Sequence, residues 1–519
     1  METTSPPDQA ETIAFLMRPA SFDEPVHTVE RIDTHGAMIF LAGSRAYKLK
    51  RSVKLPYLDF STPDLRRRVC EREFELNRRT APGLYLDVLT IRRDERGELH
   101  FGGEGEAVDT VIVMKRFPDS ALLDRMSEAG ELDPSLMQPL AHTIRQFHEA
   151  AERKPNAPWV QTLSDIIDTL DETLLGPDAA PLNLAAEPYL TALRQELKSR
   201  NSFLLARQAD GYVRRCHGDL HLKNIVLLDG TPVLFDALEF DDDLIAIDVL
   251  YDLAFLLMDL WHRGNLREAN TVLNAYFDEE ASADAWAGLQ LMPLFLSLRA
   301  AIRAMVGVHG LGVAGETRQG EAEEGIRAYA ALAADLLPAQ PPRVVCVGGL
   351  SGTGKTGVAR GLAPAIGSAP GAIHLRTDVE RKRMFGKAPE TRLPANAYGE
   401  AANQAVYRRV MDRAAAVLNA GHAVIIDAGF RQPEEREAAA QLARQASVPF
   451  LGLWLEADAE RMLARVEQRR GDASDAGREV VLQQLRSPIV PPHDWTSINA
   501  NGTPDQTLGY AHAAFAAVS

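Results

Sequence analysis

The sequence predicts two domains of mixed helix and strand content, an α+β domain over residues 1–337 and an α/β domain with a parallel sheet over 343–519. A chain of 519 residues is longer than one hydrophobic core usually supports. Residues 338–342 read Pro-Ala-Gln-Pro-Pro, which is the clearest break in the chain. After this break short apolar runs alternate with helical segments, whereas before it a strand-rich stretch precedes a long helical one.

The composition is that of an ordinary globular protein, with 46% apolar and 25% charged residues. A net charge of −16 argues against broad nucleic-acid binding, although a local basic site stays open. The three cysteines, Cys70, Cys216 and Cys346, lie far apart and predict neither a zinc site nor a disulfide framework. The acidic, polar start is unlike a signal peptide, and acids interrupt the longest apolar run, Leu244–Trp261. We therefore expect a cytoplasmic protein without membrane spans.

The first domain begins with strands and continues with helices. Short β-branched and aromatic runs predict strands at Val26–Ile32, Ala37–Ala42, Arg45–Lys50, Leu84–Arg92 and Ala107–Lys115, with a charged helix at Asp64–Arg79. Beyond residue 120, helices are expected at 133–153, 160–174 and 187–208, then two short apolar segments at Ile225–Leu228 and Val233–Phe235, and further helices from Asp248 to about 337. The short apolar segments are surrounded by a cluster of acids.

That cluster has the spacing of a phosphoryl-transfer site. Residues 217–224 read His-Gly-Asp-Leu-His-Leu-Lys-Asn, and Asp236 follows twelve residues beyond Asn224. The protein-kinase catalytic loop has a His, an Asp and an Asn at these places, followed by a further Asp. Asp219 would accept the proton of a substrate hydroxyl, while Asn224 and Asp236 would supply the oxygen ligands that Mg²⁺ prefers. The alternative is a polar loop between two strands.

Gly218, in place of Arg, is the form found in aminoglycoside phosphotransferases and choline-kinase-like proteins. Residues 27–310 resemble that family, which implies a bilobal, protein-kinase-like fold that binds ATP. The resemblance extends to Asp248-Val-Leu-Tyr-Asp-Leu-Ala, where it implies that Asp252 braces the catalytic loop. Two departures stand out: Thr34-His35-Gly36 is the only glycine turn where a longer glycine-rich loop is common, and residues 122–200 show no recognisable acceptor pattern.

The same resemblance implies a lysine that contacts the ATP phosphates. Lys48 and Lys50 lie on one face of the third strand, and Lys48 has the place that the family uses. Its ion-pair partner is expected on the next helix, at Glu73 or, second, Glu75. Residues 111–117 resemble the hinge that receives the adenine.

The second domain opens with a phosphate-binding loop. Residues 349–356, Gly-Leu-Ser-Gly-Thr-Gly-Lys-Thr, fit G-x-x-x-x-G-K-[ST], and they stand between an apolar run at 343–347 and a helix at 357–362. In that context Lys355 reaches the β- and γ-phosphates and the Thr356 hydroxyl holds Mg²⁺. A glycine turn with a chance Lys-Thr is the alternative. The expected nucleotide contacts are Gly349, Ser351, Gly352, Thr353, Gly354, Lys355 and Thr356.

An acid follows the next expected strand, Ala372–Arg376. Asp378 stands at the carboxyl end of that strand, where open α/β sheets bind ligands, and it is suited to orient or deprotonate an acceptor hydroxyl. Arg381, one helical turn on, is suited to hold an anionic group of the acceptor. Asp378-x-x-Arg381 resembles gluconate kinase, polynucleotide kinase and zeta-toxin-like P-loop kinases.

Two further segments complete the expected second site. The strand Ala423–Asp427 ends in an acid placed to share Mg²⁺, and Val448–Leu455 is a fourth strand. The segment 460–470 is a helix with Arg461, Arg465 and Arg469 on one face. It resembles the lid of these kinases, in which Arg465 and Arg469 would neutralise the transferring phosphoryl group. The alternative is a solvated basic face.

Both halves therefore predict phosphotransferases. Our leading hypothesis is a bifunctional ATP- and Mg²⁺-dependent kinase acting on hydroxyls of small molecules such as sugars or nucleotides. A second hypothesis makes one domain a silent, nucleotide-binding regulator of the other. A third makes the second domain a 5′-hydroxyl polynucleotide kinase. The domain has no room for the helical subdomain of an AAA-type motor. Neither the acceptors nor the oligomeric state can be predicted from the sequence.

Overall fold

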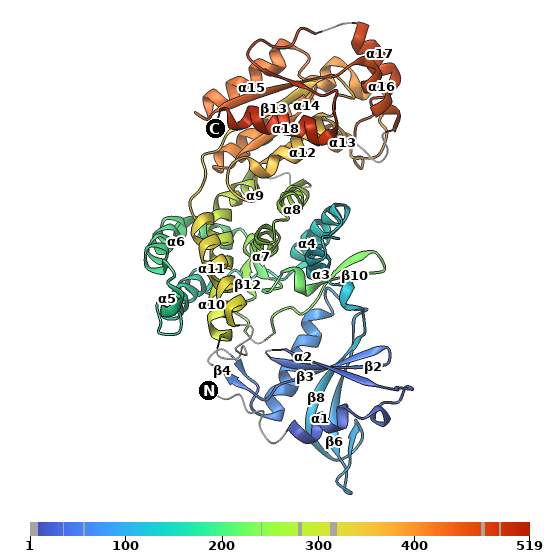
Figure 1. Cartoon of the computed structure of the whole chain (residues 1–519), viewed down its shortest axis with the longest axis vertical. Helices are drawn as coiled ribbons and strands as arrows, with labels where there is room; N and C mark the ends of the chain where they lie inside the picture. The colour runs from blue at the N-terminus through green and yellow to red at the C-terminus, as the bar shows by residue number, and fades with distance from the viewer. Residues whose placement is uncertain are drawn as a thin grey trace. The chain divides into compact units, whose positions relative to one another are not determined.

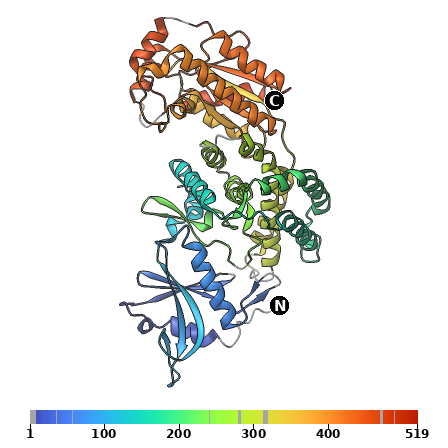
Figure 2. The ribbon, with the colours of Figure 1, turned by 180° about the vertical axis from the view of Figure 1, so that it is seen from behind.

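The computed structural model describes residues 9–34, 36–55, 58–239, 241–278, 283–311, 319–468, 473–486 and 489–518. The chain forms two compact units, which Figures 1 and 2 show from opposite sides. Unit 1 comprises Met1–Asp259 and Ala304–Arg327, and unit 2 comprises Leu260–Arg303 and Ala328–Ser519. Unit 2 therefore takes in helices that precede the proline-rich segment 338–342. The domain boundary expected at that segment stays a prediction.

Unit 1 begins with an antiparallel sheet of six strands in the order β1-β2-β3-β8-β6-β7. The strands are β1 (Val29–Asp33), β2 (Ala37–Ala42), β3 (Arg45–Lys50), β6 (Tyr85–Arg93), β7 (Leu99–Phe101) and β8 (Glu106–Lys115). One face buries Met38, Phe40, Tyr47, Leu49 and Val111 as a core with α1 (Ala10–Leu16). Five of these strands confirm the sequence prediction within a few residues, and β7 was not expected because it has only three residues.

The other face of this sheet is covered by α2 (Pro63–Asn77), which packs against β8 (Figure 1). The helix begins where Thr62 accepts a hydrogen bond from the backbone N–H of Leu65, and Pro63 takes the first position. Its inward side buries Cys70, Glu73 and Asn77. A carboxylate with no exposed surface needs a partner, and the sheet supplies two lysines, described below.

The rest of unit 1 is mainly helical. It contains β4 (Lys54–Leu55), β5 (Leu58–Asp59), α3 (Leu123–Glu128), α4 (Met137–Ala150), α5 (Trp159–Leu174), α6 (Ala186–Ala209), β9 (Val213–Arg215), β10 (Ile225–Leu228), β11 (Thr231–Leu234) and β12 (Ala246–Asp248). β9 pairs with β12, and β10 pairs with β11 as a hairpin. The β9–β12 pair holds the two ends of the segment 216–245, which carries the acid cluster and contains the β10–β11 hairpin. α7 (Val249–His262) follows directly.

Unit 2 is built on a parallel sheet of five strands in the order β14-β15-β13-β16-β17. The strands are β13 (Val344–Gly349), β14 (Ile373–Arg376), β15 (Val424–Asp427), β16 (Phe450–Glu456) and β17 (Thr496–Asn499). Four of them confirm the sequence prediction. β17 reads Thr-Ser-Ile-Asn, which has too few apolar residues to stand out as a strand.

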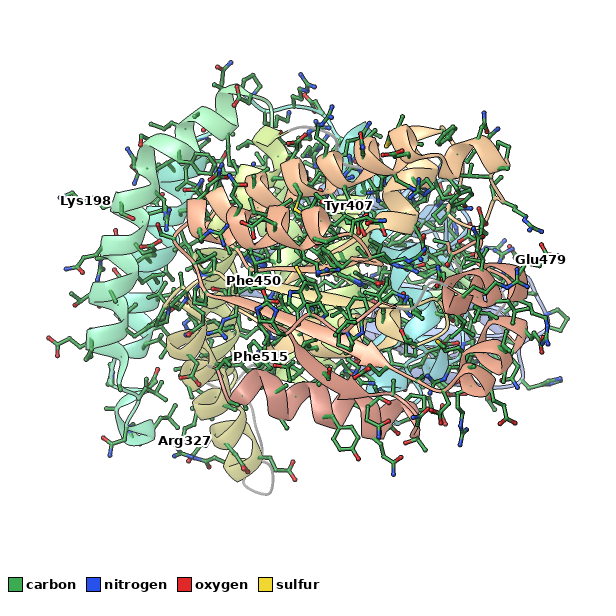
Figure 3. All side chains as sticks on the ribbon, turned by 90° about the horizontal axis from the view of Figure 1, so that it is seen from above. Lys198, Arg327, Tyr407, Phe450, Glu479 and Phe515 are labelled. Carbon is green, nitrogen blue, oxygen red and sulfur yellow. The ribbon has the colours of Figure 1, made fainter. Side chains whose placement is uncertain are left out.

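Helices cover both faces of this sheet. Figure 3 shows α14 (Glu400–Asn419), which carries Tyr407, and α18 (Pro504–Ala516), which carries Phe515, on opposite sides of β16 with Phe450. α12 (Lys355–Leu362) packs with α18 on a core of valine, leucine and isoleucine side chains. The remaining helices are α13 (Thr377–Met384), α15 (Pro433–Gln445), α16 (Ala459–Gln468) and α17 (Arg478–Arg486). The carboxyl ends of the strands therefore meet the starts of α12 and α13 at one edge.

Unit 2 also contains helices from before the proline-rich segment. α8 (Leu266–Asp278) lies against β14, and α9 (Ala283–Ala287) lies against α14. α10 (Met292–Gly310) begins in unit 2 and ends in unit 1, whereas α11 (Gln319–Leu336) begins in unit 1 and ends in unit 2. Among the described residues one helical stretch, Ala285–Gly310, is long and apolar enough to cross a membrane, and 72% of its window is buried inside the protein. Cys70, Cys216 and Cys346 are buried and form no disulfide.

Candidate functional sites

The first site is centred on two lysines of β3. Alternation along the strand turns Tyr47 and Leu49 to the core and places Lys48 and Lys50 on the face toward α2. Lys48 Nζ lies 2.8 Å from Glu73 Oε1, and Lys50 Nζ lies 2.5 Å from Glu73 Oε2. The structure therefore places Glu73, not Glu75, as the partner of Lys48. It also shows that Glu73 is shared by both lysines.

Two more acids complete this charge cluster. Lys48 Nζ lies 2.5 Å from Asp236 Oδ1, and Lys50 Nζ lies 2.5 Å from Glu239 Oε1. The side chain of Glu239 is 9% exposed and paired with Lys50, which makes it part of this structural cluster. The sequence offered no signal for this pair, because 189 positions separate its members.

The charges of Lys48 and Glu73 each stabilise the charged form of the other. Burial raises the pKa of Glu73, but the charges of Lys48 and Lys50 outweigh it and hold that pKa at about 2. Burial likewise opposes the charge on Lys48, yet Asp236 and Glu73 raise its pKa well above the ordinary value. Lys48 is therefore a fixed positive charge that joins β3, α2 and the segment after β11. That is the charge which the resemblance assigns to the ATP phosphates.

Asp219 and Asn224 lie together in the loop between β9 and β10. Asn224 Nδ2 donates to Asp219 O at 2.9 Å and to Asp219 Oδ2 at 2.8 Å. This leaves the amide oxygen of Asn224 for another partner. The β10–β11 hairpin then returns the chain to Asp236, which has a positive φ of 61°. Asp236 contacts Lys48, and the backbone N–H of Phe235 donates to Asn224 O, so Asp219, Asn224 and Asp236 lie in one region of unit 1.

Buried acids of α7 hold this loop. Asp252 accepts hydrogen bonds from the backbone N–H of His217 at 3.0 Å and of Gly218 at 2.9 Å. This confirms the brace that the resemblance implied. His148 Nε2 lies 3.1 Å from the same carboxylate, and Asp259 accepts from the backbone N–H of Leu222 at 3.0 Å. Neither His148 nor Asp259 was expected, because their contacts depend on how α4 and α7 pack.

Packing explains the glycine in His-Gly-Asp. Gly218 has a φ of 83°, which is the left-handed region that favours glycine. A Cβ there would lie 2.9 Å from Ile245 Cγ2 and 3.1 Å from Leu238 Cβ. The arginine of protein kinases does not fit at this position. Phe117, in the segment expected to receive adenine, packs edge-to-face on Phe235 with ring centroids 5.6 Å apart.

The second site is built on the glycine loop between β13 and α12. Gly349, Gly352 and Gly354 all have positive φ, at 137°, 86° and 94°. A Cβ on Gly349 would lie 2.6 Å from Leu455 O, and one on Gly352 would lie 2.5 Å from Met462 O. Both glycines are therefore required by a close backbone approach as well as by their dihedral angles. The loop leads into the start of α12, where backbone N–H groups favour an anion.

The carboxyl end of β15 supplies the partner of this loop. Parallel pairing sets Val347 opposite Asp427, and Thr356 Oγ1 donates to Asp427 Oδ2 at 2.6 Å. His374 Nε2 and Arg376 Nε lie 3.7 and 3.6 Å from the same oxygen. Burial raises the pKa of Asp427, but the adjacent His374 and the charge of Arg376 hold it well below its usual range. Asp427 is therefore an ionised oxygen donor beside Thr356.

Lys355 lies at the same loop, where its Nζ donates to Leu350 O at 2.8 Å. Asp378 lies in the first turn of α13, directly after β14. Burial raises the pKa of Asp378, and the neighbouring charge of Asp427 raises it further. A carboxylate whose negative charge is destabilised by burial and by a neighbouring negative charge is suited to accept a proton. The two acids thus have pKa values shifted in opposite directions.

The structure brings one of the expected lid arginines to the glycine loop. Arg465 Nη1 donates to Thr353 O at 3.2 Å, and its Nη2 donates to Ala500 O at 2.8 Å. Arg469 lies outside the described residues. Gln484 of α17, which was not expected, accepts from the backbone N–H of Ser351 at 2.9 Å. A catalytic role for the two arginines stays a prediction.

Arg381 contacts the segment that follows α13. It is 6% exposed, donates to Ala397 O at 2.8 Å and stacks over the Tyr398 ring at 5.0 Å. Its neighbour Lys382 lies 2.6 Å from Asp475 Oδ2. The contacts of Arg381 fix α13 to Ala397 and Tyr398, and they occupy part of the Arg381 guanidinium. Its role in binding an acceptor stays a prediction.

Comparisons with known proteins match two segments of the chain to different families. Residues 58–290 match the model of a family described as "Phosphotransferase enzyme family", and residues 344–489 match that of a family described as "AAA domain". An uncharacterized protein of Mycobacterium tuberculosis is 29% identical over 508 residues, which cover 94% of this chain and 95% of the relative.

Solved structures resemble separate parts of the chain. A choline/ethanolamine kinase family protein from Mesorhizobium loti is 15% identical with a TM-score of 0.38, covering 63% of this chain and 99% of that one. A sugar kinase from Janibacter sp. is 22% identical with a TM-score of 0.27, covering 34% and 95%. Two segments of the chain thus match different family models, and the second of them contains the glycine loop and four strands of the five-stranded parallel sheet.

Proposed function

We propose that the chain is a bifunctional kinase of the cytoplasm that transfers the γ-phosphoryl group of ATP to hydroxyl groups of small molecules, once at each site. The observation that carries the proposal is that each unit has its own set of groups for this chemistry. Unit 1 groups Lys48, Glu73 and Asp236. Unit 2 groups Thr356 with Asp427. Each set contains a cation for the phosphates, Lys48 or Lys355, together with oxygen donors. Each also has a separate base, Asp219 or Asp378.

In unit 1, Lys48 binds the α- and β-phosphates, and Glu73 holds Lys48 in place. Asp219 accepts the proton of the acceptor hydroxyl. At the same time the hydroxyl oxygen forms the new bond to the γ-phosphorus, and the bond from that phosphorus to the oxygen of the β-phosphate breaks. The amide oxygen of Asn224 and the carboxylate of Asp236 are hard donors that suit Mg²⁺. When bound, Mg²⁺ neutralises phosphate charge. Catalysis then depends on position and charge, without a covalent intermediate.

In unit 2, the backbone of residues 349–354 surrounds the phosphates, and Lys355 binds the β- and γ-phosphates. Thr356 and Asp427 are the donor pair that fits Mg²⁺, because a hydroxyl and an ionised carboxylate already lie 2.6 Å apart. Asp378 orients the acceptor hydroxyl and takes its proton, for which its raised pKa is suited. Arg465 supports the loop through Thr353 and counters charge that develops in the transition state.

The proposal is tested with full-length protein, labelled ATP and a metabolite extract. Asp219→Ala is expected to remove one set of labelled products, and Lys355→Ala a different set, each by at least about 100-fold. Exposed residues of the same type supply the controls, Asp210→Ala in unit 1 and Lys387→Ala in unit 2, which should leave both sets unchanged. If one substitution removes every product, the two-kinase proposal is wrong, and the other unit is a regulator.

A 5′-hydroxyl oligonucleotide belongs in the same experiment. Label that appears on the oligonucleotide and disappears with Lys355→Ala would assign unit 2 a polynucleotide acceptor in place of a small molecule. The net charge of −16 does not favour that result, because a polynucleotide-binding surface is usually basic.

A further inference from the structure

The edge strand of the parallel sheet is covered by a helix from far earlier in the chain. β14 is the outermost strand, next to β15. α8 lies along it within unit 2. α8 belongs to the segment 58–290 that matches the phosphotransferase family, whereas β14 belongs to the segment 344–489 that matches the P-loop family. An element of one family match thus completes the sheet of the other.

Two asparagines of α8 take the place of a neighbouring strand. Asn274 Oδ1 accepts from the backbone N–H of His374 at 2.7 Å, and its Nδ2 donates to Ala372 O at 3.3 Å. Asn270 Nδ2 donates to Ala372 O and to Pro370 O, each at 3.0 Å. Residues 372 and 374 present their backbone groups on the same edge of the strand. An uncovered edge would leave these groups without protein partners.

The end of α8 is held by charges of α13 and α14. Arg383 Nη2 lies 2.8 Å from Asp278 Oδ1, and Arg383 Nη1 lies 3.2 Å from Glu380 Oε2. Arg413 Nη1 lies 2.8 Å from the same Glu380 oxygen, and its Nη2 donates to Phe277 O and Asp278 O, each at 3.5 Å. Cations at the carboxyl end of a helix are favourable. The side chain of Glu380 is 3% exposed, so this cluster is buried at its centre.

Both contacts act on the elements that carry the second site. The His374 backbone is fixed by Asn274, and the His374 ring stands 3.7 Å from Asp427, which in turn accepts from Thr356. Arg383 lies five residues after Asp378 on α13, so the Asp278 contact orients the helix whose first turn carries the proposed base.

We propose that Asn274 and Asp278 are positioning residues for the P-loop site, so that this site depends on helix α8 from before the proline-rich segment. The inference rests on the proposed function of unit 2 and adds to it. α8 touches no reacting atom; it sets the position of β14 and α13. Loosening these elements displaces Asp378 from the glycine loop and His374 from Asp427, and a displacement of about 1 Å can lower a rate by about 100-fold.

The test uses full-length protein with Asp219→Ala in every sample, so that the remaining Mg²⁺-dependent ATP turnover belongs to unit 2. Water serves as the acceptor, and ATP is the only ligand added. Asn274→Ala and Asp278→Asn are each expected to lower kcat at least about tenfold while the KM for ATP stays within about twofold. Amide hydrogen exchange over residues 372–384 should become faster, and exchange over 344–362 should stay unchanged.

Thr271→Ala is the matched control, because its hydroxyl donates to Arg267 O on the same helix. This variant should leave kcat and hydrogen exchange unchanged. Asp278→Glu, which keeps the charge, should recover part of the kcat that Asp278→Asn loses. Unchanged exchange over 372–384 in Asn274→Ala overturns the inference, as does faster exchange throughout unit 2 with KM and kcat both altered, since that would be general destabilisation.

Failure of the proposed function gives a different result. If the Asp219→Ala parent has no turnover that Lys355→Ala removes, the proposed activity of unit 2 is wrong. The positioning role is then decided by hydrogen exchange over 372–384 alone.

Discussion

At the scale of single residues, the two sites differ in how they hold their charges. In unit 1 Lys48, which we propose binds phosphate, shares Glu73 with a second lysine, Lys50, which is itself paired with Glu239. A buried charge is costly unless it is paired, so removing one partner leaves the other exposed to the full desolvation penalty. In unit 2 the two pKa shifts have opposite signs: the pKa of Asp427 is lowered by its cationic neighbours, and that of Asp378 is raised by burial.

Lys50→Met tests the structural pair. Burial raises the pKa of Glu239, and the substitution removes the cation that opposes this effect. We expect unit 1 to lose about 3 kcal/mol of unfolding free energy, measured by urea denaturation. The double variant Lys50→Met/Glu239→Gln should recover part of the loss. Lys115→Met, at an exposed position on β8, is the control and should cost less than about 0.5 kcal/mol.

Gly218→Ala tests the packing of the catalytic loop. The added Cβ meets Ile245 and Leu238, so the loop must move, and Asp219 moves with it. We expect transfer at the first site to fall by about 100-fold, measured with labelled ATP, while transfer at the second site is unchanged. Gly230→Ala is the control, since Gly230 also has a positive φ of 78° but has no atom within 4 Å of the new Cβ. Equal losses in both variants would assign the effect to backbone strain alone.

At the scale of secondary-structure elements, α13 is held by the ion pairs of Glu380 and Arg383 and by the hydrogen bond of Arg381. Glu380 is the centre of three arginines, Arg383, Arg409 and Arg413. Burial raises the pKa of Glu380, but the charges of Arg413, Arg383 and Arg409 bring it below the ordinary value. A carboxylate whose folded-state pKa is lowered stabilises the fold above its unfolded-state pKa, and that stabilisation is lost as the pH falls.

Glu380→Gln should therefore have an effect that depends on pH. At pH 7 we expect a loss of about 2 kcal/mol in the unfolding free energy of unit 2. The difference from the unsubstituted protein should shrink as the pH falls below the ordinary carboxyl value of about 4.5, because the unfolded state binds a proton there and folded Glu380 does so only below its lowered pKa. Denaturant unfolding across this pH range is the measurement. Glu437→Gln, in an exposed pair with Arg444, should change stability little at any pH.

At the scale of the whole molecule, one chain carries two proposed phosphoryl-transfer sites, one in each compact unit. The relative from Mycobacterium tuberculosis aligns over 94% of this chain, so the match covers both units. If the sites are independent, a substitution at a metal-binding donor in one should leave the metal requirement of the other unchanged.

Thr356→Val tests this independence. The variant removes the hydroxyl that lies beside Asp427. We expect the Mg²⁺ concentration for half-maximal transfer at the second site to rise at least about tenfold, since one donor of the site is lost. Transfer at the first site should keep its Mg²⁺ dependence. Thr391→Val, at an exposed position of unit 2, is the control. A shift at both sites would contradict independence.

The sequence by itself determined the local features of this protein. The glycine loop, the spacing from Asp219 to Asp236 and most strands depend on residues that are close in the chain, and their periodicity and turn chemistry are readable there. Only the tertiary structure decided the pairings over long separations: Lys50 with Glu239, Asp252 with the catalytic loop, and α8 with β14. Such contacts depend on which faces pack together, and a single sequence carries no pattern that specifies them.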